Sequence, residues 1–289
     1  FYYYTGTGWA WMHSNANADT LAWRTGGNTG TNANHFIGTA DNRDLIFKRN
    51  NVRSGYISTT NTAWGANALN PASTGFNNTA LGLQALLSNT TSSRNTAIGV
   101  RALTFNTTGA DNTAIGMETL RWNEGNSNVA VGFRSLDSNT TGYSNAAMGT
   151  KSLISNTIGF QNSAVGMNAL FSNTSGNNNV ASGFQSLYFN TSGYNNTANG
   201  MEALKANTSG YNNTATGTQA LFANTTGVFN TATGVAALSS NTTGYNNTAM
   251  GMQALNSNIN GIFNTATGMA SLFFNTSGSA NTATGMDAL

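Results

Sequence analysis

Few side chains in this sequence could carry out acid–base or metal chemistry. The 289 residues include two histidines and no cysteine, and only 7% are charged. His13 and His35 do not stand at a spacing typical of metal ligands, so we interpret them as turn or hairpin residues. Without cysteine, the chain cannot form disulfides or thiolate metal sites. We therefore expect no cofactor and no metal.

Three carboxylates are the remaining candidates for catalysis. Glu118, Glu124 and Asp137 could supply the pair of acids that glycoside cleavage requires. Glu124, however, falls in an irregular part of the repeat described next, where we expect a turn. With so few titratable groups we do not expect an enzyme. A glycan-cleaving tailspike is therefore the third of our hypotheses.

The elements that would position any site form one internal repeat that begins at Asn61. The pattern Asn-Thr-Ala-x-Gly-x-x-Ala-Leu-x-x-Asn-Thr-Thr/Ser-Gly-x-x returns every 17 residues, with one 16-residue interval between Asn112 and Asn128. Units this short and this rich in Thr, Asn and Gly are too poor in helix formers for helices. We predict an all-β chain, a parallel β-roll or β-solenoid of about fourteen 17-residue coils. Each coil would hold two strands, Asn-Thr-Ala-x-Gly-x and a second centred on Ala-Leu-x-x.

Stacking the coils in register turns each repeat position into a column of equivalent side chains. The leucine column should form the structural core ladder: Leu86, Leu103, Leu120, Leu136, Leu153, Leu170, Leu187, Leu204, Leu221, Leu238, Leu255 and Leu272. The glycines that follow Thr-Thr/Ser should form turns by adopting positive φ: Gly142, Gly159, Gly176, Gly193, Gly210, Gly227 and Gly244. We expect the second asparagine of each repeat, as in Asn89 and Asn106, to form amide ladders rather than to carry glycans.

The first sixty residues lack the repeat, which gives two domains, 1–60 and 61–289. Residues 1–4 and 9–12 predict one β-hairpin, and residues 44–48 and 52–57, joined by Asn50-Asn51, predict another. We expect this small N-terminal module to cap the open end of the stack.

Two exposed columns are candidate binding surfaces. The residue before the strand glycine is apolar from Trp64 to Val165 and mostly polar afterwards. If this column faces solvent, its first half needs a partner, so we predict a homo-oligomer and favour a trimer wound around a common axis. The threonines of Thr-Ala-Thr strands would form a flat array resembling the ice-binding faces of solenoid antifreeze proteins: Thr214, Thr216, Thr231, Thr233, Thr265 and Thr267.

Aromatic residues at turns and flanks are a third candidate surface. They could stack on the sugar rings of surface glycans, or they could pack between subunits, which we favour. The members are Phe76, Trp122, Tyr143, Phe160, Tyr188, Phe189, Tyr194, Tyr211, Tyr245, Phe273 and Phe274.

Charge and hydropathy argue against other partner classes. The net charge is +2 and no basic stripe is present, so we expect no nucleic acid partner. No apolar run reaches the length of a membrane span, so we expect no membrane insertion in this segment. The chain opens on Phe1 and stops at Leu289 inside a repeat, and we expect it to be part of a longer polypeptide.

The motif Asn-Thr-Ala-Ile-Gly, at 95–99 and 112–116, resembles the strand motif of trimeric autotransporter adhesin heads. That resemblance implies left-handed parallel β-rolls assembled as trimers. Residues 34–48, followed by the repeats, resemble tail-fibre-like surface proteins of bacteria and phages. Such proteins often end in an endosialidase-type intramolecular chaperone, which this sequence does not contain.

Besides the glycan-cleaving tailspike, which is the third, these observations lead to one leading hypothesis and one alternative. We expect a structural fibre or adhesin stalk, extracellular on a cell surface, virion or tail fibre, that presents a repetitive lateral surface to other fibre subunits or to surface glycans. The alternative is an ice- or glycan-binding β-solenoid that uses its threonine or aromatic columns.

Overall fold

In the computed structural model, residues 2–4, 9–11 and 41–289 are described, and every regular element among them is a β-strand. The chain divides into two compact units, Phe1–Leu45 and Ile46–Leu289. In the first, β1 (Tyr2–Tyr4) and β2 (Trp9–Trp11) pair antiparallel, which confirms the first predicted hairpin. His13, His35, the predicted turn at 5–8 and residues 34–40 lie outside the described residues.

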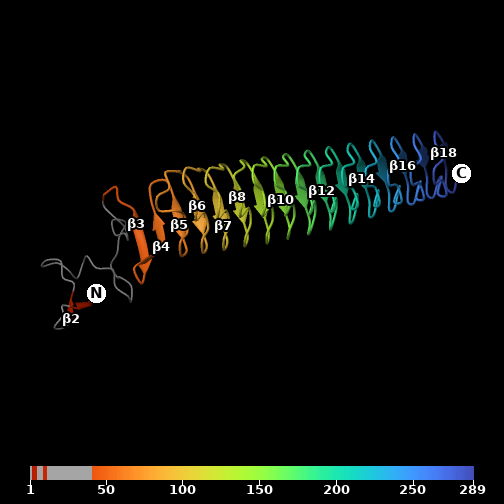
Figure 1. Ribbon diagram of the computed structural model, residues 1–289. Helices are drawn as coiled ribbons and strands as arrows, with labels where there is room; N and C mark the ends of the chain where they lie inside the picture. Colours follow the sequence, from red (N-terminus) through yellow and green to blue (C-terminus); the bar gives the residue numbers. More distant parts are fainter. Residues whose placement is uncertain (1, 5–8, 12–40) are drawn as a thin grey trace. The chain divides into compact units, whose positions relative to one another are not determined.

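The second unit is an elongated stack of coils that share one sheet of sixteen strands (Figure 1). Its first two strands are β3 (Leu45–Arg49) and β4 (Val52–Ile57). One strand of three residues follows in each coil: β5 (Thr62–Trp64), β6 (Thr79–Leu81), β7 (Thr96–Ile98), β8 (Thr113–Ile115), β9 (Val129–Val131), β10 (Ala146–Met148), β11 (Ser163–Val165), β12 (Val180–Ser182), β13 (Thr197–Asn199), β14 (Thr214–Thr216), β15 (Thr231–Thr233), β16 (Thr248–Met250), β17 (Thr265–Thr267) and β18 (Thr282–Thr284).

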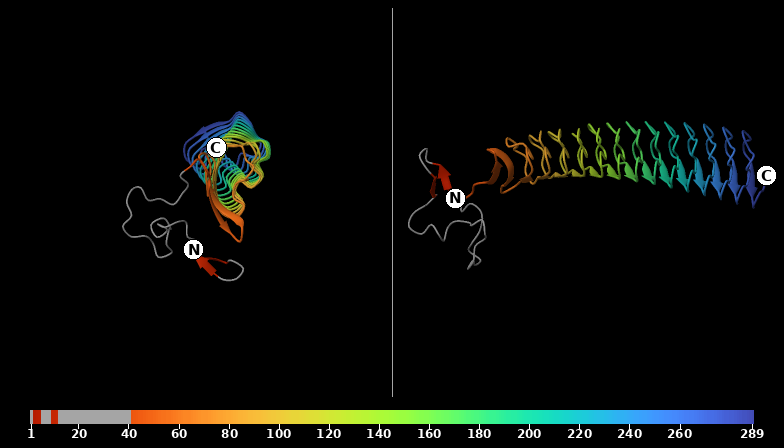
Figure 2. Two further views of the ribbon diagram at one scale, coloured as in Figure 1. Left: turned by 90° about the vertical axis from the view of Figure 1, so that its left-hand side faces the viewer. Right: turned by 90° about the horizontal axis from the view of Figure 1, so that it is seen from below.

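From β5 to β18, each strand is parallel to the equivalent strand of the next coil, and residues one repeat apart in the sequence lie opposite one another. Ala198 of β13, for example, lies opposite Ala215 of β14. The register holds across the 16-residue interval, where Thr113 lies opposite Val129. The predicted parallel β-solenoid is therefore confirmed, and fourteen coils at the ordinary strand spacing give a rod ~65 Å long. Viewed along its axis, the rod shows the coils lying over one another with a gradual rotation (Figure 2).

The prediction of a second strand in each coil is wrong. The segment that contains the leucine forms turns, and the leucines adopt a left-handed backbone, as in Leu170 with φ 50° and Leu204 with φ 51°. A left-handed backbone is costly for a residue with a bulky side chain such as leucine. It bends the chain sharply and directs the leucine inward, where burial of its side chain offsets the cost.

The core is a narrow column made of one leucine and one or two small residues per coil. Each leucine of the repeat column from Leu69 to Leu255 is fully buried, and Leu272 is almost so. The alanine in the middle of each strand, such as Ala198, faces the same interior. Because strand side chains alternate, the residues on either side of that alanine point outward.

Two sets of glycines shape each coil for different reasons. The glycine after each strand has the positive φ, as in Gly183 at 139°, a region that only glycine adopts readily. The turn glycines do not have the positive φ that we predicted for them. They are required because the chain packs closely there: a Cβ on Gly193 would lie 2.3 Å from Asn190 Oδ1 and 2.4 Å from Gly210 O.

A ladder of amides runs through the interior at the second asparagine of the repeat, as predicted. Asn207 Nδ2 donates to Asn190 Oδ1 of the preceding coil at 2.8 Å and to Gly210 O of its own turn at 3.0 Å. The same pair of bonds recurs in each coil from Asn123 to Asn275. An amide both donates and accepts, so the column satisfies its own buried polar groups.

A second amide ladder, which the sequence analysis did not identify, is formed by the asparagine before each strand. Asn213 donates its backbone N–H to Asn196 Oδ1 at 3.0 Å, and its Nδ2 reaches the same oxygen at 3.2 Å and Gly227 O at 2.8 Å. These side chains are also buried. Each coil is thus joined to the next by two amide ladders as well as by its backbone.

The N-terminal end of the parallel sheet is covered by the second predicted hairpin, β3–β4, which is confirmed. Its turn residues Asn50 and Asn51 have φ of 47° and 60°, typical of a two-residue hairpin turn. β4 pairs antiparallel with β5. Arg53 Nη2 donates to Ala68 O at 3.1 Å and also to Leu69 O, carbonyls of the first coil. The hairpin therefore supplies donors that a preceding coil would otherwise provide.

Replacing Leu170 by Asp should disrupt the stack, because it places an unpaired charge in a column that excludes water. We expect a loss of several kcal/mol in the free energy of unfolding, measured by thermal or urea unfolding followed by circular dichroism. The control Asn178→Asp adds the same charge at an exposed position of the same coil and should leave the unfolding midpoint unchanged. Equal midpoints for the two variants would contradict the assignment of the leucine column to the core.

Candidate functional site

The strand face is the first candidate surface, and the structure places the predicted threonines on it. Thr214 and Thr216 are both exposed and lie beside Thr231 and Thr233 in register. The array continues through β17 and β18 but is interrupted by Met250 in β16. Threonine hydroxyls here are about one strand spacing apart along the rod, which forms a flat and uncharged face.

An apolar ridge flanks the strand glycines along the rod. We define it as the residues directly before and after these glycines in each coil. Met148 before Gly149 is 49% exposed, and Met167 after Gly166 is 47% exposed. The column after the glycine stays mainly apolar to the C-terminal coil, whereas the column before it becomes mainly polar from Ser182 onward. None of the residues in the two columns is ionisable.

Glu118 and Asp137, two of the candidate catalytic acids, are held by shared arginines. Arg134 Nη2 lies 2.8 Å from Asp137 Oδ2, and Arg121 Nη2 donates to the same oxygen at 3.2 Å while its Nε lies 3.0 Å from Asp137 Oδ1. Both arginines also pair with Glu118, at 3.5 and 3.6 Å, and Arg101 adds a further contact at 3.5 Å. The cluster joins three successive coils, so we assign both carboxylates to stacking.

The third candidate acid, Glu124, lies at the turn of the 16-residue coil. In the regular coils, one backbone carbonyl accepts the hydrogen bonds of this turn. In a regular turn, Thr157 O accepts bonds from the N–H groups of Thr140, Thr141 and Gly142 of the preceding coil, at 2.9 to 3.2 Å. The Thr140 hydroxyl donates to the same oxygen at 2.8 Å. Deleting one residue removes this arrangement.

In the short coil, the Glu124 carboxylate takes the place of that carbonyl. It accepts bonds from the N–H groups of Thr107, at 3.2 Å, and Thr108, at 2.9 Å, and from both hydroxyls, at 2.5 and 2.9 Å. Burial raises the pKa of Glu124, but these hydrogen bonds outweigh it and hold the pKa below its ordinary value. The side chain therefore repairs the turn.

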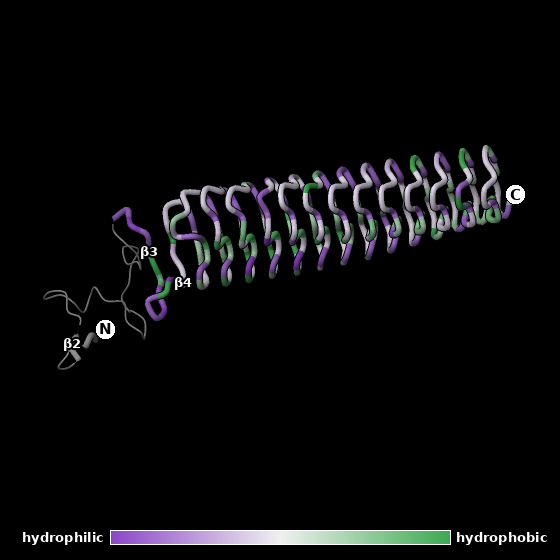
Figure 3. The backbone as a smooth tube through the Cα atoms, viewed as in Figure 1, coloured by the Kyte–Doolittle hydropathy of each residue, from purple (hydrophilic) through white to green (hydrophobic). Residues whose placement is uncertain are grey.

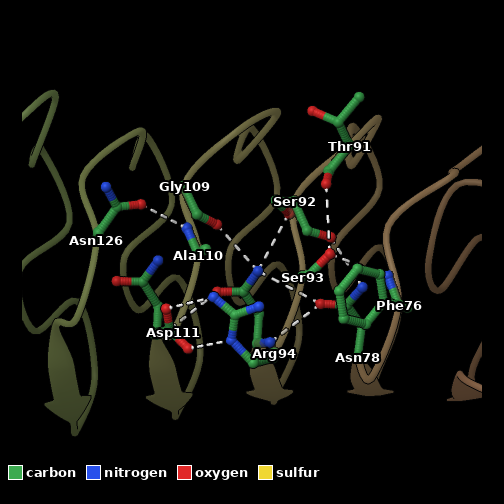
Figure 4. Close-up of polar contacts among 12 residues, drawn as sticks. Phe76, Asn78, Thr91, Ser92, Ser93, Arg94, Gly109, Ala110, Asp111 and Asn126 are labelled. Atoms are coloured by element: carbon green, nitrogen blue, oxygen red, sulfur yellow. Dashed lines mark hydrogen bonds and ion pairs between the residues drawn. The ribbon is translucent and has the colours of Figure 1, made fainter.

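Other polar residues that depart from the repeat also form hydrogen bonds with neighbouring coils (Figure 4). Ser92 stands where other coils have the turn glycine, and its hydroxyl accepts from Asn106 Nδ2 at 2.9 Å. Nearby, Arg94 and Asp111 form a two-bond ion pair on the surface, at 2.5 and 2.8 Å. The hydrogen bond from Arg94 holds the pKa of the Asp111 carboxyl below its ordinary value.

Most of the predicted aromatic residues contact aromatic rings of neighbouring coils. Tyr194 and Tyr211 stack at 4.7 Å between centroids with 3° between their planes. Tyr143 stacks on Phe160 at 4.9 Å with an angle of 1°. Rings stacked in this way cover one another's faces and show mainly their edges to solvent. These contacts between coils of one chain are a role that we did not predict for the aromatic residues, and packing between subunits stays a prediction.

Asn-x-Thr/Ser sequons at the second asparagine of the repeat are not accessible in the folded chain. Asn89, Asn106, Asn139, Asn173 and Asn190 are fully buried, and all of them except Asn89 lie in the amide ladder. Attachment of a sugar would require both burial and the ladder bonds to be lost. The structure thus supports the ladder role of this column over a glycan role.

The described part of the chain lacks two further kinds of feature. None of its groups of His, Asp or Glu has three or more members placed to hold a metal ion. It also has no helix with the length and hydrophobicity that crossing a membrane requires. No family model, curated protein or solved structure matches the sequence.

Replacing Glu124 by Gln should weaken the short coil, because the amide nitrogen of Gln would face hydrogen-bond donors. We expect a loss of about 1 to 2 kcal/mol at neutral pH, at the low end for bonds to a charged group since the site is partly solvated. The measurement is urea unfolding of both proteins as a function of pH. Because the folded-state pKa is lowered, the difference should be full above the pKa of an unfolded Glu and should vanish as pH falls through the lowered value.

The matched control is Asp111→Asn, which removes one carboxylate from an exposed ion pair one coil away. Solvent screening should make its effect on unfolding too small to measure. A pH-independent difference between Glu124→Gln and the unmodified chain would show that the carboxylate charge is not what stabilises the turn.

Proposed function

We propose that this chain is a stiff spacer in a surface fibre or adhesin stalk, assembled from parallel copies of itself along the apolar ridge. The observation that carries the proposal is the ridge: an uncharged, largely apolar column pair that runs the length of the coils and is about half exposed in a single chain. Contiguous apolar surface of this extent is typical of an interface rather than of a monomer's free surface.

The geometry of the coils supports association along their length. Every coil places the ridge residues at the same point of its cross-section, since the register is constant from β5 to β18. A second copy aligned in parallel therefore meets the same pattern at every coil. A closed ring of copies around a common axis would bury the ridge of each, and we favour three copies.

The change in composition along the ridge divides the rod into two parts. From Leu81 to Val165 both ridge columns are mainly apolar, which favours a tight interface. From Ser182 on, the column before the glycine is mainly threonine and asparagine, and the strand face becomes hydrophilic. We propose that the first part holds the copies together and that the second offers more of its surface to the surroundings, outside a cell or virion.

Sedimentation equilibrium of the whole chain should give a mass of more than one copy, and three is the favoured value. Val165→Lys combined with Met167→Lys places two charges on the ridge of one coil and should shift the equilibrium strongly toward single chains. Both positions are exposed in the single chain, so the circular dichroism spectrum should not change.

Ile158→Lys combined with Asn178→Lys adds the same two charges at exposed positions away from the ridge. This control should sediment as the unmodified chain does. The proposal fails if the unmodified chain sediments as a single copy, or if the ridge variant assembles as well as the control.

The threonine array supports a second candidate function, binding of ice by the strand face of β14 to β18. It rests on the exposed, in-register threonines of β14 and β15. The test is thermal hysteresis of the whole chain before and after Thr216→Lys combined with Thr233→Lys. Absence of thermal hysteresis in the unmodified chain would dispose of this candidate.

A further inference from the structure

Two exposed phenylalanines near the C-terminal end stand where most coils have a polar residue. Phe229 and Phe263 occupy the last position of their repeats, which is asparagine at Asn212 and Asn246. They are 49% and 54% exposed. Neither was among the aromatic residues that the sequence analysis selected, because both interrupt a repeat pattern instead of belonging to it.

Their backbone conformation makes this exposure costly. Phe229 has φ 57° and Phe263 has φ 58°, in the left-handed region that asparagine enters easily and a bulky side chain does not. The leucines of the core offset the same cost by complete burial, but half-exposed rings gain much less. The conformation itself belongs to the repeat, since Arg94 and Gln161 share it at 59° and 55°. What is particular to the two phenylalanines is that a large apolar ring is left half exposed there.

The two rings are oriented differently from the stacked aromatic residues. Phe229 is perpendicular to Tyr211, with centroids 5.5 Å apart and 80° between the planes, and Phe263 meets Tyr245 at 5.5 Å and 78°. Tyr211 itself stacks on Tyr194 of the coil before it. A ring turned by about a right angle from such a stack lies along the rod, so that one of its faces is not covered by the next coil.

The pair repeats with a period of two coils. Phe229 and Phe263 are 34 residues apart, and the coil between them carries Tyr245 and Asn246 at the corresponding positions. The platforms are therefore about 9.6 Å apart along the axis, twice the strand spacing. Along this row of loops, apolar segments alternate with hydrophilic ones toward the C terminus (Figure 3).

We propose that Phe229 and Phe263 are two stacking platforms for an uncharged, extended polysaccharide that runs along the rod. Two pyranose rings of an extended β-1,4-linked chain cover about the distance between the platforms. Alternate rings of such a chain turn the same face to one side, so every second sugar would stack on a phenylalanine. Tyr245 and Asn246 are exposed on the coil between the platforms, and their hydroxyl and amide would hydrogen-bond the intervening sugar.

The lack of charged residues at this end of the rod favours a neutral ligand. From Ala206 to Met286 the sequence contains no Asp, Glu, His, Lys or Arg. Carboxylates or sulfates on a glycan would find no cation to pair with and would lose hydration on binding. Tyrosine, asparagine and threonine beside exposed aromatic rings are the residues that adaptable, uncharged recognition surfaces use.

The test is affinity electrophoresis of the whole chain in gels that contain β-1,4-linked glucomannan, xylan, dextran or polygalacturonate. We expect retardation by at least one of the two β-1,4-linked neutral glycans and none by dextran, which is not extended, or by charged polygalacturonate. Phe229→Asn combined with Phe263→Asn should weaken that retardation at least about tenfold, since both stacking faces are lost. Its melting temperature should equal or exceed that of the unmodified chain, because Asn suits the left-handed backbone.

Phe189→Ser is the matched control, since it removes an equally exposed ring from a position where several coils have serine. It should leave retardation unchanged. The inference is overturned by failure of both β-1,4-linked glycans to retard the chain, by equal retardation in dextran or polygalacturonate, or by unchanged retardation of the double variant. It is also overturned if the double variant melts at a lower temperature or changes the number of copies, since the rings would then serve folding or self-association.

This inference rests on the proposed function only in taking the side of the rod as a surface for attachment. Its outcome is separate from that of sedimentation: a single chain that binds glucomannan would contradict the assembly and support the platforms. An oligomer that binds no glycan would do the reverse.

Discussion

The structure depends on one constraint, that every side chain lies directly over its equivalent in the next coil. Backbone pairing between parallel strands imposes this register, and two asparagine ladders reinforce it in the interior. A residue therefore suits a column position only if its side chain can lie one strand spacing away from an identical side chain. Asparagine does so because each amide donates to one neighbour and accepts from the other.

The same constraint accounts for the scarcity of charge. Identical charges stacked at the strand spacing would repel along the whole column. In the column that holds the most ionisable residues, Glu118 lies between Arg101 and Arg134 and pairs with both, and only Lys151 follows a residue of its own sign. A content of 7% charged residues, which in another chain would suggest disorder, here follows from stacking order.

The period, the core column, the turns and both hairpins could be predicted from sequence because each depends on a residue type that recurs or on a local turn signal. The second strand could not. β-propensity describes a residue in an extended chain, whereas the leucines fold inward through a left-handed backbone that their burial stabilises. The ladder before each strand was missed because Asn-Thr-Ala is equally consistent with an exposed strand start. Recognising Glu124 as a substitute for a carbonyl requires the geometry of the turn.

In a chain whose repeated residues are explained by stacking, a specific function is to be sought in the departures from the repeat. Some departures restore what the repeat has lost: Glu124 replaces a deleted carbonyl, and Ser92 replaces a turn glycine. Phe229 and Phe263 do not replace any interaction that the repeat has lost. They leave large apolar rings half exposed in a left-handed backbone, and each ring lies 5.5 Å from the equivalent tyrosine of the preceding coil, Tyr211 or Tyr245. Stacking alone would favour asparagine at both positions, and this is why we look for the role of the two rings in binding and not in the fold.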